Sequence, residues 1–167
     1  MGCIEGQRLH SPRHRPYDAA GRGVGGGDLS GPRAVLLDTC ACIWLMNGDP
    51  LRAASREALG AAQMVGAVHV SPITAWEIAM LVARGRLVLT RAPTSWFAAL
   101  LALPGVALAP MPPEVLMASA SLPGTPPRDP ADRIIAATAR AYGQVVITRD
   151  AVLLGYAQAR HIDVIAC

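Results

Sequence analysis

Four acidic residues lie where a surface charge is unexpected, either just after a short apolar run or within an apolar stretch of the chain. They are Asp38, Glu77, Asp132 and Asp150. If the fold brings them together, their like charges repel, so the pocket either raises the pKa values of the carboxyl groups or takes up a cation. Oxygen ligands without a His or Cys cluster suit Mg²⁺ or Mn²⁺. Such a metal next to a phosphodiester orients and activates water, which is the chemistry of a nuclease.

Each of these acids also has a simpler structural explanation, and the sequence leaves both explanations open. Asp38 fits a turn after a strand, and Asp150 fits the N-cap of a following helix. Asp132, in the first turn of a predicted helix, would interact favourably with the helix dipole. Glu77 can form an ion pair with Arg84 or another arginine. The prediction of one pocket therefore depends on the four acids taken together.

The elements that must position these acids alternate along the chain. Short apolar runs predict buried strands at 34–37, 68–70, 106–108, 145–147 and 164–166. Helices are predicted at 40–46, 51–62, 72–84, 94–101, 113–120, 130–142 and 151–157. This alternation is typical of an α/β fold with a mainly parallel, buried sheet. Asp38 and Asp150 then lie at the carboxyl ends of strands, the edge where open α/β sheets bind ligands.

Proline and glycine mark the ends of two of the predicted helices. Ser71-Pro72 and Asp129-Pro130 each combine an N-cap residue with proline at the first helical position. Gly85 and Gly143 suit the C-terminal ends. We therefore interpret Asp129 as a helix cap rather than a ligand, although its side chain points the same way as that of Asp132 three residues later.

Composition limits the class of protein. The 167 residues suffice for one domain with a real core, and 52% of them are apolar. No apolar run approaches the roughly 18 residues of a membrane span, and the N-terminus lacks the apolar segment of a secretory signal. These features predict a soluble, cytoplasmic protein without a membrane segment.

All fifteen cationic side chains are arginine, and the formal net charge is +3. The absence of lysine excludes Schiff-base chemistry, a Walker-type phosphate lysine and a lysine general base. Arginine suits phosphate contacts, because its guanidinium binds two oxygens at once. The four cysteines and four histidines show no zinc-ligand spacing, so a zinc site is not expected.

Residues 1–32 differ from the rest of the chain. They are rich in Gly, Arg, Pro and His and show no apolar periodicity. We interpret them as a disordered tail or as an extension added by an incorrectly assigned start codon. The folded domain is expected to cover residues 33–167.

Four segments of the chain resemble the successive motifs of PIN-domain proteins of the VapC toxin type. The segments are Leu36-Leu-Asp-Thr39, Ser71-Pro-Ile-Thr-Ala-Trp-Glu-Ile-Ala79, Asp129-Pro-Ala-Asp-Arg-Ile-Ile-Ala-Ala137 and Val146-Ile-Thr-Arg-Asp150. The resemblance extends from about Ala34 to Cys167, in the right order and spacing. It implies a three-layer α/β/α sandwich around a mostly parallel sheet.

The resemblance also implies a catalytic and metal-binding site. Asp38, Glu77, Asp132 and Asp150 match the four acids that hold Mg²⁺ or Mn²⁺, and the fourth acid varies most among relatives. Thr148 matches a hydroxyl that often supports the site, and Thr39 a small polar neighbour of the first acid. Many relatives have His where Cys40 stands, which leaves the acids of the site intact.

VapC proteins are endoribonucleases that a small VapB antitoxin neutralises by covering the site. The resemblance therefore implies an RNA substrate and an antitoxin partner, and we also expect a homodimer. Trp44, Trp76 and the methionine-bearing helices are candidates for the antitoxin groove, although core burial explains Trp76 equally well. Aromatic residues are too few for a base-stacking platform, so we expect recognition through the shape and backbone of the RNA. Five arginines are candidate phosphate contacts: Arg84, Arg86, Arg128, Arg133 and Arg149.

Three other functions compete with this one. A stand-alone PIN nuclease of RNA processing would have the same domain sequence but no antitoxin gene beside it. A catalytically silent PIN binding module is disfavoured because all four acids are present. A phosphoacceptor receiver domain also places an aspartate at a strand end, but it typically needs a late lysine that this chain lacks.

Overall fold

The protein is described by a computed structural model, which covers residues 32–167. The expectation of a disordered or wrongly included tail concerns residues that, apart from Pro32, lie outside this range. Strands and helices alternate much as the sequence predicts. Their order is β1 (Val35–Leu37), α1 (Thr39–Asn47), α2 (Ala53–Met64), β2 (Val68–Val70), α3 (Pro72–Ala83), α4 (Pro93–Leu101), β3 (Val106–Leu108), α5 (Pro113–Ala120), α6 (Pro130–Tyr142), β4 (Val145–Thr148), α7 (Ala151–Gln158) and β5 (Asp163–Ala166).

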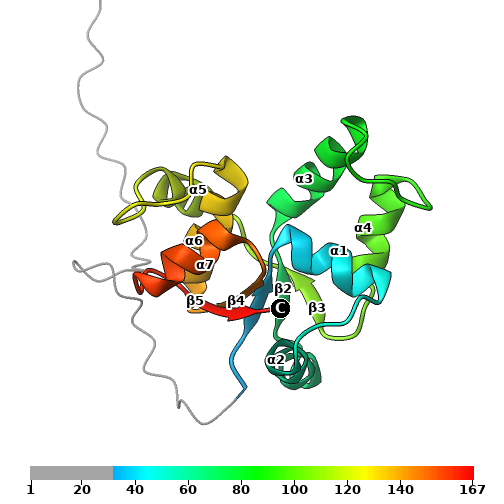
Figure 1. The fold of residues 1–167 in the computed structure, drawn as a ribbon, viewed down its shortest axis with the longest axis horizontal. Coiled ribbons are helices and arrows are strands. Elements are labelled where there is room, and N and C mark those ends of the chain that lie inside the picture. The colour runs from blue at the N-terminus through cyan, green and yellow to red at the C-terminus, as the bar shows by residue number, and fades with distance from the viewer. Residues whose placement is uncertain (1–31) are drawn as a thin grey trace, which may run out of the picture.

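The five strands form one sheet in the order β3-β2-β1-β4-β5 (Figure 1). Every neighbouring pair is parallel, so the expectation of a mainly parallel sheet is confirmed. Leu37 at the end of β1 is level with Val70 of β2 and Ile147 of β4. The chain progresses from β1 to β3 in one direction and then crosses back to place β4 on the other side of β1. This reversal creates a topological switch point between β1 and β4, the position where open α/β sheets bind ligands.

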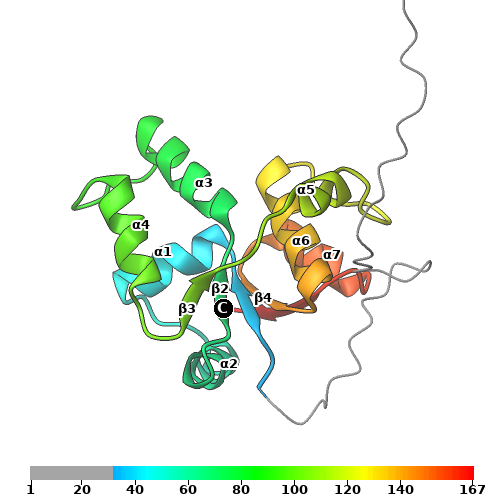
Figure 2. The same cartoon turned by 180° about the vertical axis from the view of Figure 1, so that it is seen from behind.

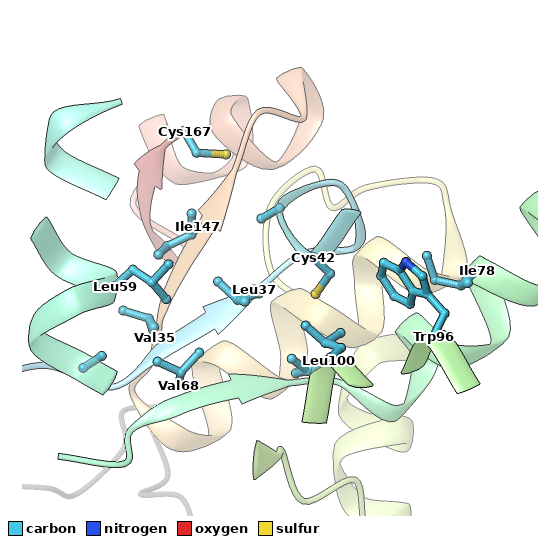
Figure 3. Packing of buried hydrophobic residues seen from close by; sticks show 13 residues of the cluster. Val35, Leu37, Cys42, Leu59, Val68, Ile78, Trp96, Leu100, Ile147 and Cys167 are labelled. Carbon is cyan, nitrogen blue, oxygen red and sulfur yellow. The ribbon is translucent and has the colours of Figure 1, made fainter. Parts of the chain in front are cut away.

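Helices cover both faces of the sheet, which confirms the predicted α/β/α sandwich. Figures 1 and 2 show α1, α3 and α4 on one side and α5, α6 and α7 on the other. The side chains of β1 alternate accordingly. Val35 and Leu37 pack with Leu59 of α2 and Leu100 of α4 (Figure 3), whereas Leu36 packs on the opposite face. Hydrophobic packing on both faces therefore holds the central strand β1 in place and fixes the direction in which its carboxyl end points.

The predicted helix signals act as expected around α3. The Ser71 hydroxyl accepts a hydrogen bond from the Ile73 N–H, and Pro72 occupies the first turn. At the other end Gly85 adopts φ +66°, a left-handed conformation that glycine accepts without strain. The Arg86 N–H then reaches back to the Leu81 carbonyl, which closes the helix. Local residues therefore determine where α3 begins and ends.

Among residues 32–167, none of the helices has the length and apolar character that crossing a membrane requires.

Candidate active site

Asp38 lies at the switch point, directly after β1. It is only 3% exposed. One carboxylate oxygen accepts the Ala41 N–H at 2.6 Å and so caps α1, while the other accepts the hydroxyl of Thr148 at the end of β4. Burial raises the pKa of Asp38 to about 6, and the negative charge of Asp150 adds to this, although both hydrogen bonds act in the opposite direction. An aspartate that titrates this close to neutral pH is typical of a functional site.

Thr148 connects two of the predicted acids. It is fully buried, and its hydroxyl donates to Asp38 while accepting the N–H of Asp150 at 2.9 Å. The hydroxyl thus fixes the distance between the ends of β1 and β4 through side chains, in addition to the strand pairing. The supporting role implied for Thr148 agrees with this geometry.

Glu77 accepts a hydrogen bond from Thr39, and the hydroxyl of Thr39 also lies beside that of Thr74. The Thr39 hydroxyl lies 2.5 Å from Glu77 Oε2 and 3.3 Å from the hydroxyl of Thr74. The pKa of Glu77 is raised chiefly by burial, and further by the charges of Asp129 and Asp38, while the Thr39 hydrogen bond lowers it. Arg84 is not its ion-pair partner in the structure, so the simpler explanation offered for Glu77 does not apply among the described residues.

Asp132 projects from the first turn of α6. Its pKa is raised to about 7, first by burial and then by the charges of Asp150, Asp129, Glu77 and Asp38 in that order. The favourable interaction with the helix dipole is therefore outweighed by desolvation and by neighbouring carboxylates. Asp132 is thus the acid whose pKa is raised by all of the other acids named here, so its carboxyl group lies within range of all their charges.

Asp150 and Asp129 both act as N-caps. Asp150 Oδ1 accepts the N–H groups of Val152 and Leu153 at 2.8 and 3.0 Å, which starts α7. Asp129 Oδ1 accepts the Ala131 N–H at 2.8 Å, which starts α6 and confirms the predicted cap. The capping explanation for Asp150 is therefore correct, yet its charge also raises the pKa values of Asp38 and Asp132.

Asp129 belongs to the surroundings of the site, although the sequence led us to exclude it. Its charge raises the pKa values of both Glu77 and Asp132. The available signal was the three-residue spacing from Asp132, which we set aside in favour of the cap. Thr74 was also missed, and its signal was the same spacing: it lies three residues before Glu77, one helical turn away.

The acid group is not neutralised by arginine within residues 32–167. The ion pair formed there joins Arg33 to Asp163, at the amino ends of the strands. The thiol of Cys40 is affected by the resulting negative potential. Although the residue as a whole is exposed, partial burial of its thiol and the charges of four acids raise its pKa to about 12; the acids are Asp38, Asp150, Glu77 and Asp132. Among the described residues, no three His, Cys, Asp or Glu side chains are arranged as a ready metal-binding group. Several of the carboxylate oxygens instead accept hydrogen bonds from the protein.

The candidate arginines separate into two sets. Arg133 donates to the carbonyls of Ser119, Ala120 and Pro127, which ties the end of α5 to α6. Arg149 donates to the Cys167 carbonyl at 2.7 Å and stacks over Trp44 at 3.8 Å. These two are structural in the described fold. The remaining three are exposed, and their guanidinium groups have no hydrogen-bond or ion-pair partner within residues 32–167: Arg84, Arg86 and Arg128.

Known proteins share both the sequence pattern and the fold. Residues 35–159 match a family model described as PIN domain. No curated protein matches the chain in sequence. Among solved structures, VapBC2 from Rickettsia felis bound to a DNA fragment from its promoter has a chain of similar fold, with a TM-score of 0.55, 12% identity and coverage of 80% of this chain and 98% of that one. FitAcB from Neisseria gonorrhoeae aligns with a TM-score of 0.47, 24% identity and coverage of 78% and 95%.

Proposed function

Because the chain belongs to the PIN domain family, we propose that it is a divalent-metal-dependent endoribonuclease and the toxin of a VapBC-type toxin–antitoxin pair. The observation that carries the proposal is the group of mutually repelling carboxylates at the switch point between β1 and β4. The raised pKa values of Asp38, Glu77 and Asp132 and the lack of a neutralising arginine among residues 32–167 describe a site that favours a cation. Helix capping accounts for Asp38 and Asp150 one by one, but it does not account for a group of four carboxylates at one edge of the sheet.

The donor set suits Mg²⁺ or Mn²⁺, which are hard cations that prefer carboxylate oxygens. The residues that would hold the ion are Asp38, Glu77, Asp132 and Asp150. When bound, the metal would lower the pKa of a water molecule and neutralise charge on the scissile phosphate.

The protein's own residues have separate tasks in this proposal. Thr148 and Thr39 hold the carboxylates of Asp38 and Glu77 in fixed orientations, so that little reorganisation is needed when a cation or substrate arrives. The exposed guanidinium groups of Arg84, Arg86 and Arg128 supply the contacts to RNA phosphates. Arg133 and Arg149, which were also candidates for this task, are assigned to the fold instead.

The antitoxin part of the proposal is supported by exposed apolar residues. Trp76 on α3 is 54% exposed and Val88, shortly after α3, is 91% exposed. Large exposed apolar side chains can form part of a surface that a protein partner covers, and we expect such a partner to cover this region and the site. We propose that this partner is an antitoxin encoded by an adjacent gene, that the protein acts in the cytoplasm, and that it forms a homodimer, which light scattering on the purified protein would measure.

The central test compares RNA cleavage by the wild type with cleavage by Asp38→Asn. Total RNA is incubated with the purified protein and Mg²⁺ or Mn²⁺, and the cleavage sites are mapped. Asp49→Asn serves as the matched control, because Asp49 is an exposed aspartate outside the acid group. We expect Asp38→Asn to lose cleavage by orders of magnitude and Asp49→Asn to retain it. Equal cleavage by Asp38→Asn and the wild type would refute the proposed mechanism.

The toxin assignment needs a separate experiment, because a stand-alone nuclease would pass the first one. The chain is expressed alone and together with the product of the adjacent short gene. Growth arrest that the second gene product relieves, together with co-purification of the two proteins, is the expected result. Harmless expression of an active nuclease with no such neighbour would favour RNA processing.

A further inference from the structure

A groove on α3 opens directly beside the acid group. We call it the α3 groove, a shallow cavity of about 120 Å³ lined by Trp76, Glu77, Met80, Leu81, Arg84, Arg86 and Asp129. Glu77 and Asp129 both line it, and their charges also raise the pKa of Asp132. The groove is therefore continuous with the candidate active site rather than separate from it.

The lining residues follow one strip of the helix. Glu77, Met80, Leu81 and Arg84 have the spacing of neighbours on one helical face. From Glu77 to Arg84 the strip extends for about 10 Å along the axis, at 1.5 Å per residue. Along this distance the acidic Glu77 is followed by an apolar stretch, Met80 and Leu81, and then by the basic Arg84. A ligand that lies in the groove with its reacting group at the acids thus meets first an apolar surface and then cations.

Trp76 is unusual for an indole because it is 54% exposed. Within the described residues its ring takes part in no aromatic pair and lies under no guanidinium; the interactions of those kinds involve Tyr156 with His161 and Trp44 with Arg149. An open indole face next to a groove is a surface on which a planar base can stack. The chain has too few aromatic residues for a stacking platform of several rings, but a single exposed ring is enough to stack on one base.

Arg84 and Arg86 are the two cations that line the groove. Both are exposed, and the guanidinium group of neither has a hydrogen-bond or ion-pair partner in the described part of the chain. The left-handed conformation of Gly85 between them ends α3 and turns the chain there. Two unengaged guanidinium groups beside an apolar groove favour an anionic ligand over a cationic peptide.

On the basis of the proposed function, we propose that the α3 groove binds an unpaired nucleotide next to the scissile phosphate. The base stacks on Trp76 over the Met80 side chain, and Arg84 and Arg86 hold the adjoining backbone phosphate. In an A-form duplex the bases are stacked on one another and cannot reach such a surface, whereas loops and bulges can present them.

The test measures binding without cleavage. All variants carry Asp38→Asn, and binding of a fluorescently labelled single-stranded RNA and of its duplex is followed by anisotropy in Mg²⁺. Trp76→Ala should weaken single-strand binding by about fivefold or more, since stacking on one aromatic residue has that effect. Trp76→Phe should restore most of the binding, and duplex binding should not change.

The arginines are tested through salt dependence. Arg84→Ala and Arg86→Ala should each make the plot of log binding constant against log salt less steep by about 0.7, because each substitution removes one cation that neutralises a phosphate. Arg33→Ala is the matched control, because Arg33 is an exposed arginine at the opposite edge of the sheet. It should leave the slope as it is.

The outcomes separate this inference from the proposed function. If Trp76→Ala binds single strands as the parent does, or weakens duplex binding equally, the groove does not bind an unpaired base. If Trp76→Ala loses only binding of the antitoxin, the groove belongs to a protein partner and the inference is wrong. If the variants behave as expected but the wild type cleaves no RNA in Mg²⁺ or Mn²⁺, the inference is supported while the nuclease proposal fails.

Discussion

Thr148 has no charge, yet its hydroxyl bonds to two of the four acids. Replacement by valine keeps the shape of the side chain but leaves a buried oxygen of Asp38 without its donor. Thr148→Val should lower the free energy of unfolding by about 1–3 kcal/mol and reduce cleavage, because an unsatisfied buried acceptor is costly. Thr148→Ser should recover most of both. Chemical denaturation of the three proteins measures the effect, and a valine variant as stable as the wild type would show that the hydroxyl does not hold Asp38.

Asp132 makes the stability of the metal-free protein depend on pH. Its pKa rises from 3.8 to about 7 in the folded protein, so the native state binds the proton more tightly than the unfolded state does. Stability therefore decreases as pH rises from about 4 to about 7, and the decrease is complete above that range. Asp132→Asn should remove much of this decrease and unfold at a higher temperature than the wild type at pH 8. Calorimetry without metal across this range tests the sign; parallel curves for the two proteins would contradict it.

At the scale of elements, three helices begin at aspartates that belong to or act on the site. They are α1 at Asp38, α6 at Asp129 and α7 at Asp150. The positive ends of these helices point at the acid group, which compensates part of the repulsion. Capping and a ligand role are therefore not alternatives for Asp129 and Asp150, although they looked so from the sequence, because a single oxygen of each side chain makes the cap.

Substitutions of Asp129 can distinguish its role as a helix cap from the effect of its charge on the site. Asn caps a helix about as well as Asp, whereas Ala does not. Asp129→Asn should be at least as stable as the wild type, because it keeps the cap and removes a charge that acts on Glu77 and Asp132. Asp129→Ala should lose about 0.5–2 kcal/mol of unfolding free energy. Thermal unfolding of both variants in EDTA gives the comparison, and an asparagine variant as unstable as the alanine one would refute it.

The elements could be predicted from local sequence because their signals are local. Ser71-Pro72 and Gly85 specify the limits of α3 through hydrogen bonds that span a few residues. The partners of long side chains could not be predicted in the same way. Arg133 donates to two carbonyl groups at the end of α5 and to that of Pro127 in the loop before α6, and the packing of α5 against α6 brings the first two within reach. The four acids were predicted as one group from their positions at strand ends and in apolar stretches. A supporting role for Thr148 was implied by the resemblance alone, because its contact with Asp38 depends on the order of the strands.

At the scale of the whole molecule, a cation bound by the acid group would be coupled to folding. A ligand that binds only the native state raises the unfolding temperature, and the rise grows with its concentration. Mg²⁺ or Mn²⁺ should therefore stabilise the wild type, and more strongly at pH 8 than at pH 5, where protons compete for Asp38 and Asp132. Asp38→Asn and Asp132→Asn should lose most of this rise. Calorimetry with and without metal decides the matter, and an equal rise in the variants would place the cation elsewhere.

The two residues joined at the switch point, Asp38 and Thr148, are 110 positions apart in the chain. A ribosome making this protein therefore exposes Asp38 and Glu77 long before β4 exists to complete the site. Contacts between such distant segments form late and only after the intervening chain has been made. We expect the growing polypeptide to leave RNA intact, including the message and the ribosome from which it emerges. A fragment ending at Gln144, translated in vitro, should cut no RNA, and a fragment that does so would show that β4 is dispensable.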